Sequence, residues 1–392
     1  MLLFNSQKSA QSIWALFFCL LLSASYLQTE GESSSTALIV FLSLGSFALY
    51  SEGIKTKKQL FIWILLVSLI VYSFLNSKIL GRSVSYAPLY LCGFHLYCCF
   101  INGSNRATRS GNLLSLSAAI LFLYVVFHCY ITLRQYYLVP IRTIGMFRDY
   151  SQASFATLIG FCIAYPRLKS TKYGFIVTLF LFAAFFSSFS RTSNFLLLFL
   201  VTGIAIYEFK LGSLKAFLPH LAMMVVAYIT VLSYPIMVAA DVVTRGGLED
   251  LKTLNSRVYY WTAAAESIKH NWLWGTGIGS FQFTGIRELV PFEEITFVHN
   301  DYLEVLHDLG IFWFIAFVLG LMYWVFSLKP FNLSREEAQT PSIEAFIAWL
   351  LLLSFCLYMA INFIVRTQFF IIVFVMLVAY LVSNEHTSDK NA

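Results

Sequence analysis

The feature that most constrains this chain is a succession of apolar runs, each about twenty residues long and almost free of charge, that continues from one end to the other. Of its 392 residues, 59% are hydrophobic and only 12% are charged, and the mean hydropathy is +0.74. An average soluble domain carries about twice that share of charge. A water-soluble fold cannot bury so much apolar surface, so the sequence predicts an all-α polytopic membrane protein.

The apolar runs predict twelve transmembrane helices, centred near residues 19, 42, 68, 95, 122, 159, 181, 201, 228, 319, 352 and 376. If both termini are cytoplasmic, the inside segments hold fourteen Lys or Arg residues and the short outside loops hold four (Lys78, Arg82, Arg191 and Arg366). This asymmetry satisfies the positive-inside rule. We therefore expect spans one to nine in residues 1–240, a long outside loop in 241–310, and three more spans with a cytoplasmic tail in 311–392.

The scattered positions of the polar residues exclude two classes of site. The formal charge of +6 is spread over short loops with no basic block, so no nucleic-acid partner is expected. All seven cysteines fall inside apolar runs, where cysteine behaves as a small hydrophobe. Neither a disulfide nor a metal site is expected.

Two outside loops break the charge bias. The segment 134–152 contains Arg134, Arg142 and Arg148, and the segment 241–310 contains five positive residues and ten of the twenty carboxylates. Long loops translocate largely regardless of charge. The arginines on this face are therefore either ordinary solvated charges or functional groups, and the sequence leaves both readings open.

The long loop is expected to contain two short helices. The first runs from about Arg257 to Lys269 and is capped by Asn255 or Ser256. It carries an apolar stripe at helical spacing that rests on the bundle or on the membrane interface (Val258, Trp261, Ala265 and Ile268). The second follows His299. It is capped by Asn300 or Asp301, and Asp301 and Glu304 have the spacing of a capping box. The helix carries an apolar stripe and ends at Gly310; the stripe consists of Tyr302, Val305, Leu306 and Leu309.

Between these helices lies the glycine-rich sequence Gly275-Thr276-Gly277-Ile278-Gly279. A dinucleotide-binding fingerprint must follow a strand and open a helix. This sequence does neither, so it is interpreted as a tight turn.

Arg191 is the most prominent candidate for a functional residue. It lies in a five-residue polar break between two apolar arms of about fifteen residues each, which suggests a tip recessed below the outer membrane surface. An Arg at membrane depth costs at least about 2.5 to 3.5 kcal/mol unless it is paired or faces water. The alternative is an Arg that extends its side chain to the lipid headgroups.

Two further candidates lie in the long loop. His299 precedes the second loop helix, where the positive end of the helix dipole disfavours the imidazolium form. A neutral His299 could act as a general base. The alternative is that His299 is an ordinary polar surface residue. Arg257 and Trp261 lie four residues apart on one helix face, where the Arg can hold a phosphate bidentately or pair with a carboxylate.

Taken in order, these motifs resemble the O-antigen ligase and polymerase superfamily over roughly residues 140 to 383. The resemblance is carried by Ser190-Arg191, by Asn255-Ser256-Arg257 with Trp261, by Gly275 to Phe281, and by His299-Asn300-Asp301-Tyr302-Leu303 with Gly310. The stretch Arg142 to Phe147 is similar to an Arg-and-Gly segment of the family. Asp149-Tyr150-Ser151 stands where many relatives have Pro-Asn, which leaves the roles of Arg142 and Arg148 open.

The resemblance implies a GT-C-type glycosyltransferase in the bacterial inner membrane, with its active site on the periplasmic side. The donor would be a glycan on undecaprenyl diphosphate and, in the ligases, the acceptor a sugar hydroxyl of the lipid A core. Transfer would invert the anomeric carbon without a metal or cofactor, because the donor is already activated. By position, Arg191, Arg257 and Arg142 would bind the diphosphate, and His299 would act with Arg191 in catalysis.

Two alternatives remain at the level of sequence. An O-antigen polymerase or a protein O-oligosaccharyltransferase would use the same donor. A transporter of lipid-linked glycans would break no bond. Transporters more often show internal repeats and charged residues at mid-membrane, whereas the unusual residues here gather on one face.

Overall fold

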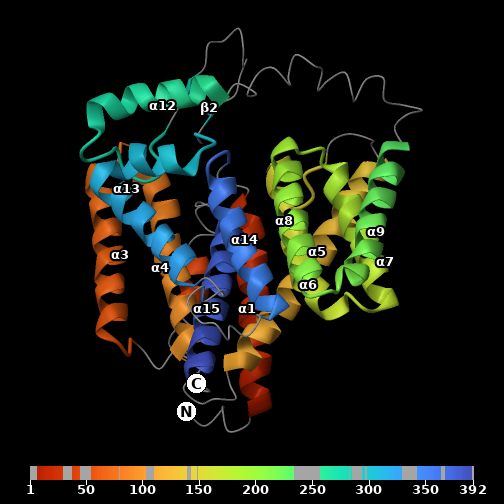
Figure 1. Ribbon diagram of the computed structural model, residues 1–392. Helices are drawn as coiled ribbons and strands as arrows, with labels where there is room; N and C mark the ends of the chain where they lie inside the picture. Colours follow the sequence, from red (N-terminus) through yellow and green to blue (C-terminus); the bar gives the residue numbers. More distant parts are fainter. Residues whose placement is uncertain are drawn as a thin grey trace. The chain divides into compact units, whose positions relative to one another are not determined.

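The computed structural model describes residues 7–29, 38–44, 54–78, 80–102, 110–138, 143–147, 149–233, 257–281, 283–284, 294–295, 298–328, 342–362 and 367–390. Nearly all regular structure in these ranges is helical (Figure 1), which confirms the all-α expectation. The helices are α1 (Gln7–Thr29), α3 (Lys57–Asn76), α4 (Leu80–Asn102), α5 (Ser110–Leu138), α6 (Tyr150–Leu168), α7 (Lys172–Ser187), α8 (Arg191–Lys210), α9 (Leu214–Ser233), α12 (Arg257–Asn271), α13 (Asp301–Ser327), α14 (Ile343–Met359) and α15 (Gln368–Lys390). Strands β1 (Phe283–Thr284) and β2 (Glu294–Ile295) pair antiparallel, with Phe283 opposite Ile295.

All twelve expected span centres fall within described helical residues, counting the short helical stretch 38–44. Within the described ranges, six helices are long and apolar enough to cross a membrane: Lys57–Asn76, Arg82–Asn102, Leu113–Leu138, Arg191–Lys210, Leu214–Ser233 and Asp301–Ser327. The chain is therefore a multi-pass membrane protein. The total of twelve spans stays a prediction.

Short polar side chains fix the starts of several helices. The hydroxyls of Thr56, Thr171 and Ser190 each accept a hydrogen bond from the backbone N–H three residues further on, at 3.1, 3.1 and 3.3 Å. Such caps satisfy one of the free N–H groups of the first turn. The sequence thus sets where α3, α7 and α8 begin.

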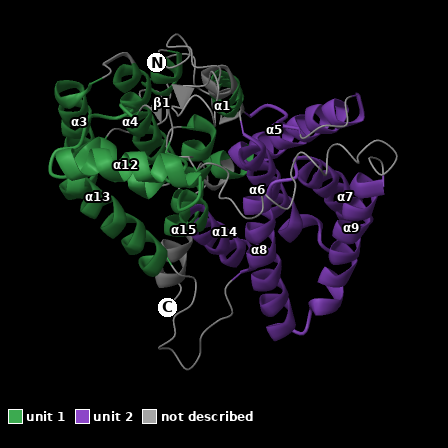
Figure 2. Ribbon diagram, turned by 90° about the horizontal axis from the view of Figure 1, so that it is seen from above, with its two compact units in different colours: residues 1–116, 254–329, 356–392 green, residues 117–253, 330–355 purple. Residues whose placement is uncertain are grey.

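The chain forms two compact units, shown in separate colours in Figure 2. Unit 1 comprises residues 1–116, 254–329 and 356–392, and unit 2 comprises 117–253 and 330–355. In unit 1, α4 packs against α3 and α15, α1 packs against α15, and α12 packs on α13. In unit 2, α7 packs against α6 and α9, and α8 contacts the same two helices. The expected division into two sets of spans and a loop concerns membrane topology and stays a prediction.

Candidate functional site

Helix α12 begins at the expected residue, Arg257, and ends at Asn271, two residues later than expected. Its expected caps, Asn255 and Ser256, lie outside the described residues. The side chain of Arg257 is half-buried at the first position of the helix.

The apolar stripe expected on α12 coincides only in part with the face that packs on protein, and its position at the membrane interface stays a prediction. Val258 is 50% exposed and Ala265 is exposed, whereas Tyr260 and Ala264 are buried. Tyr260 and Ala264 form a core cluster with Phe281 and Val298, against which Trp261 packs. The reason is that lipid and the headgroup region accept apolar side chains, so an apolar stripe in a membrane protein does not identify the face that contacts protein.

The glycine-rich sequence is a tight turn, as expected. Gly275, Gly277 and Gly279 have φ angles of 71°, 90° and 81°, in the region that favours glycine. A Cβ on Gly277 would lie 2.5 Å from the Cα of Ser77 in unit 1. Glycine therefore lets the turn approach the end of α3.

Helix α13 begins with a cap that differs in part from the expectation. The Asn300 side chain accepts the N–H of Leu303 at 3.0 Å, and Asp301 is the first helical residue. The capping box expected between Asp301 and Glu304 is wrong, because Glu304 Oε2 accepts the N–H of Val298 at 3.1 Å instead. The carboxylate thus fixes the residue that precedes His299.

Gly310 ends the first part of α13, as expected. Its φ of 75° and ψ of −179° break the helix between Asp301 and Ser327. The N–H of the next residue, Ile311, donates to the carbonyl of Trp272 at 2.9 Å, which joins the break to the end of α12. The helical residues before Gly310 therefore form a separate short segment packed on α12.

That short segment buries an unexpected polar face. Asp301, Glu304, His307 and Asp308 are at most 4% exposed. His307 Nδ1 lies 2.7 Å from Asp308 Oδ1, and His307 Nε2 lies 3.0 Å from the hydroxyl of Ser267 on α12.

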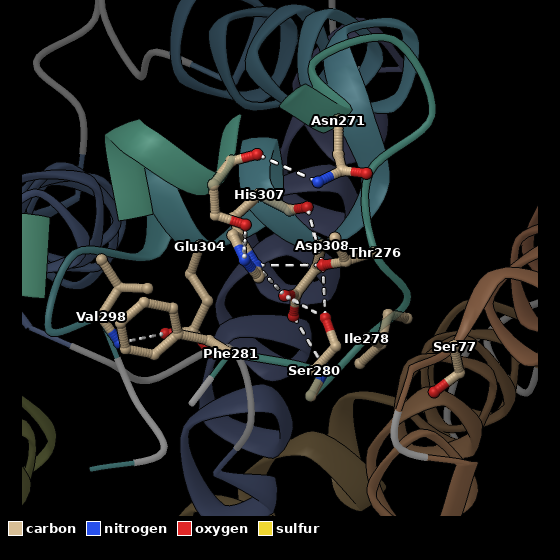
Figure 3. A network of polar contacts seen from close by, with 12 residues as sticks. Ser77, Asn271, Thr276, Ile278, Ser280, Phe281, Val298, Glu304, His307 and Asp308 are labelled. Carbon is tan, nitrogen blue, oxygen red and sulfur yellow. Dashed lines mark hydrogen bonds and ion pairs between the residues drawn. The ribbon is translucent and has the colours of Figure 1, made fainter. Parts of the chain in front are cut away.

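Asp308 also holds the glycine-rich turn (Figure 3). Its Oδ2 accepts the N–H of Gly279 at 2.8 Å, and its backbone carbonyl accepts the N–H of Gly277 at 2.7 Å. The hydroxyl of Ser280 donates to Oδ1 at 3.4 Å. One residue therefore ties the turn to α13, and His307 ties α13 to α12.

His299 lies beside this network in a strained backbone conformation. Its φ is 56°, its Nδ1 atom is buried, and its ring stacks on that of Tyr260 with centroids 5.8 Å apart and planes 28° apart. Arg257 precedes Tyr260 by three residues, and residues at this spacing share a helix face. Two predicted site residues, Arg257 and His299, thus lie at the same end of α12: Arg257 shares a helix face with Tyr260, and His299 stacks on Tyr260. Sequence reasoning missed Tyr260, although its spacing from Arg257 was a usable signal.

Arg191 is the first residue of α8, in unit 2, and it is exposed. Helix α7 has 16 residues, and α8 has 20 because it includes Arg191 to Asn194 of the polar break. The apolar arms on either side of the break are therefore about as short as expected. Next to the Ser190 cap, the hydroxyl of Ser193 donates to the carbonyl of Ser151 at 3.1 Å. The start of α8 therefore lies against the start of α6.

Arg142 and Arg148 lie outside the described residues. The neighbour of Arg142, Thr143, donates its N–H to the carbonyl of Ser187 at 3.4 Å, and the two hydroxyls are 3.1 Å apart. The described part of segment 134–152 thus contacts the end of α7, three residues before the Ser190 cap.

A shared backbone feature marks the two helix starts that carry predicted site residues. Among the described residues other than glycine, positive φ angles occur at Phe189 (49°) and His299 (56°). Each comes immediately before an N-cap residue, Ser190 or Asn300. Such conformations are sparsely populated and concentrate at functional sites.

Over the described ranges, no group of three or more His, Cys, Asp or Glu side chains is arranged to hold a metal ion. The sites consist instead of guanidinium groups, an imidazole and backbone turns at helix starts. The fold and these sites define a multi-pass membrane protein with cationic and histidine side chains at the starts of α8, α12 and α13.

Residues 176–318 match the family model described as O-antigen ligase. The match extends from α7 into the second part of α13 and includes Arg191, Arg257 and His299 but not Arg142. It confirms the resemblance to the O-antigen ligase and polymerase superfamily over these residues. Comparisons with curated proteins and with solved structures gave no match.

Proposed function

We propose that this protein is an O-antigen ligase of the bacterial inner membrane. It transfers a glycan from undecaprenyl diphosphate to a sugar hydroxyl of the lipid A core, on the periplasmic side, with inversion and without a metal or cofactor. The observation that carries the proposal is the family match over Arg191, Arg257 and His299. It is supported by the stack that joins His299 to the first turn of α12.

The proposed roles of the arginines follow from the leaving group. As the bond between the anomeric carbon and the diphosphate oxygen breaks, negative charge accumulates on the diphosphate. Guanidinium groups that are already in place stabilise this charge, and each can bind phosphate oxygens bidentately. We assign this role to Arg191 and Arg257, and Arg142 is a further candidate.

His299 is the proposed general base. Its Nδ1 is buried, and we assign the role of base to Nε2. Nε2 takes the hydroxyl proton while the oxygen forms a bond to the anomeric carbon, and the diphosphate departs with the electron pair of the broken bond. Attack from the face opposite the leaving group gives inversion.

The decisive experiment is the lipopolysaccharide profile of a strain that lacks the protein. A ligase predicts core without O-antigen and long polymer accumulated on undecaprenyl diphosphate. Core capped by a single repeat would instead identify a polymerase. A ladder identical to that of the parent strain would contradict both and direct the search to protein glycosylation or transport.

Complementation with variants tests the residues. His299→Ala removes the base, which typically contributes 10²- to 10⁴-fold, so we expect no detectable ligation, and the same for Arg191→Ala. Arg257→Lys should be impaired, because an ammonium cannot make a bidentate phosphate contact. Lys269→Ala, on the exposed face of α12, is the control and should ligate normally. A fully active His299→Ala protein would remove His299 from the mechanism.

A further inference from the structure

We infer that Tyr260 is a positioning residue that fixes the orientation of the His299 imidazole. This inference rests on the proposed function of His299 as general base. Tyr260 reaches no reacting atom in this scheme, and its effect is exerted through the ring that it stacks against.

The first argument is that Tyr260 is itself immobilised. Its side chain is 6% exposed and is packed with Ala264, Phe281 and Val298. Phe281 is fixed in turn by an edge-to-face contact with His307, with ring centroids 5.4 Å apart and planes at 85°. The ring that stacks on His299 therefore belongs to a packed core and not to a loose surface.

The second argument is that the backbone of His299 is fixed from both sides. Val298 before it donates to Glu304 at 3.1 Å, and Asn300 after it caps α13. These bonds hold His299 at its φ of 56°, a conformation that persists only where surrounding contacts determine it. The backbone sets where the side chain starts, and the Tyr260 ring sets the plane in which the imidazole lies.

The consequence concerns the chemical step. A general base must lie about 2.6–3.2 Å from the proton donor, and a misplacement of about 1 Å can cost roughly 10²-fold in rate. Loss of the stack should therefore lower kcat about 10- to 100-fold. It should leave KM for the lipid-linked donor unchanged, because no group that binds the diphosphate is removed.

The test compares two substitutions in the full-length protein reconstituted in nanodiscs, assayed with purified lipid-linked donor and acceptor. Tyr260→Phe keeps the aromatic ring and should retain near wild-type kcat. Tyr260→Leu keeps apolar volume in the core but removes the stack, and should show the loss in kcat alone. His299→Gln is measured in parallel and should be inactive.

A spectroscopic measurement separates positioning from general packing. The stacked ring should shift the Cε1–H resonance of His299 upfield, and the His299→Gln spectrum assigns that resonance. We expect the shift in the wild type and in Tyr260→Phe, and its loss in Tyr260→Leu. Because the wild-type spectrum alone tests the stack, the inference can be refuted even if Tyr260→Leu fails to fold.

The outcomes distinguish this inference from the proposed function. An inactive His299→Gln together with wild-type kcat in Tyr260→Leu would overturn the positioning role alone, as would an unshifted His299 resonance in the wild type. Full activity of His299→Gln would overturn the proposed function itself.

Discussion

At the scale of single residues, Asp308 connects helix α13 to the glycine-rich turn. Its carboxylate contacts the imidazole of His307 and accepts the N–H of Gly279, and its carbonyl accepts the N–H of Gly277. A buried carboxylate is tolerated only when such partners compensate for its lost hydration. Asp308 thus supports the turn that brings Phe281 to the Tyr260 cluster.

We predict that Asp308→Ala destabilises the purified protein by about 3 kcal/mol, because it leaves the Gly279 N–H and His307 without their partner in a buried site. Thermal unfolding in detergent measures the change. The matched control is Glu266→Ala, which removes an exposed carboxylate from α12.

The control is expected to unfold close to the wild-type temperature, because an exposed ion pair contributes little to stability. Lys269, 2.6 Å from Glu266, holds the pKa of that carboxyl below its usual range, but both side chains are largely exposed. Equal unfolding temperatures for the Asp308 and Glu266 variants would refute the structural role of Asp308.

The candidate site residues could be chosen from the sequence, but their neighbours could not be predicted from it. Arg257 and His299 are recognisable by residue type and motif. The stack between Tyr260 and His299 joins residues 39 positions apart, and the bond from Gly279 to Asp308 spans 29. Such contacts depend on tertiary packing, which cannot be predicted from the helical periodicity of one segment.

At the scale of helices, the positions of the helices along the chain could be predicted from the sequence, but the face of a helix that packs on protein could not. Charge-free runs mark where helices lie, because a spanning segment must satisfy its backbone internally and present apolar side chains. On α12, however, apolar character did not identify the face that packs on protein. Val258 and Tyr260 are both apolar in character, yet Val258 is exposed and Tyr260 is buried.

The break in α13 gives a sharp prediction at this scale. A Cβ on Gly310 would lie 2.4 Å from the carbonyl oxygen of Leu273, and the φ and ψ of Gly310 belong to a region essentially restricted to glycine. We expect Gly310→Ala to destabilise the protein by at least about 2 kcal/mol and to reduce its yield.

Gly320→Ala in the same helix is the control. A Cβ there would meet nothing within 4 Å, and Ala is favoured over Gly in helices by up to about 1 kcal/mol. It should unfold at the wild-type temperature or above. If Gly310→Ala is as stable as Gly320→Ala, the break does not require glycine.

The residues after α12 give a second prediction for an element. Trp272 and Trp274 are 54% and 58% exposed, and the hydroxyl of Tyr72, near the end of α3, donates to the carbonyl of Trp274. Exposed indoles at the end of a spanning helix are typical of the membrane–water interface.

Brominated lipids labelled near the headgroup should therefore quench wild-type fluorescence more than that of a Trp272→Phe/Trp274→Phe protein. Lipids brominated at the chain ends should make little distinction between the two proteins. Equal quenching of both proteins by the shallow label would place the two indoles away from the interface.

At the scale of the whole molecule, contacts inside unit 1 give the relative direction of two helices. Lys58 at the start of α3 lies over the ring of Tyr323 near the end of α13, at 4.8 Å. Near its other end, α3 meets the glycine-rich turn, since Ile278 donates its N–H to Ser73 at 2.8 Å. Asp308, in the first part of α13, holds the same turn. Helices α3 and α13 are therefore antiparallel, with the lysines at one end and the long loop at the other.

This arrangement predicts the orientation of the chain. The positive-inside rule predicts that the lysine-bearing end is cytoplasmic, and we therefore expect the segment 241–310 to be periplasmic. Alkaline phosphatase fused after Asp250 should be active, whereas the same enzyme fused after Gly212 should be inactive, and green fluorescent protein at the C-terminus should fluoresce. The reverse pattern would put His299 and Arg257 in the cytoplasm. A donor glycan presented on the periplasmic side could not reach them there, so the ligase proposal depends on this orientation as much as on any single residue.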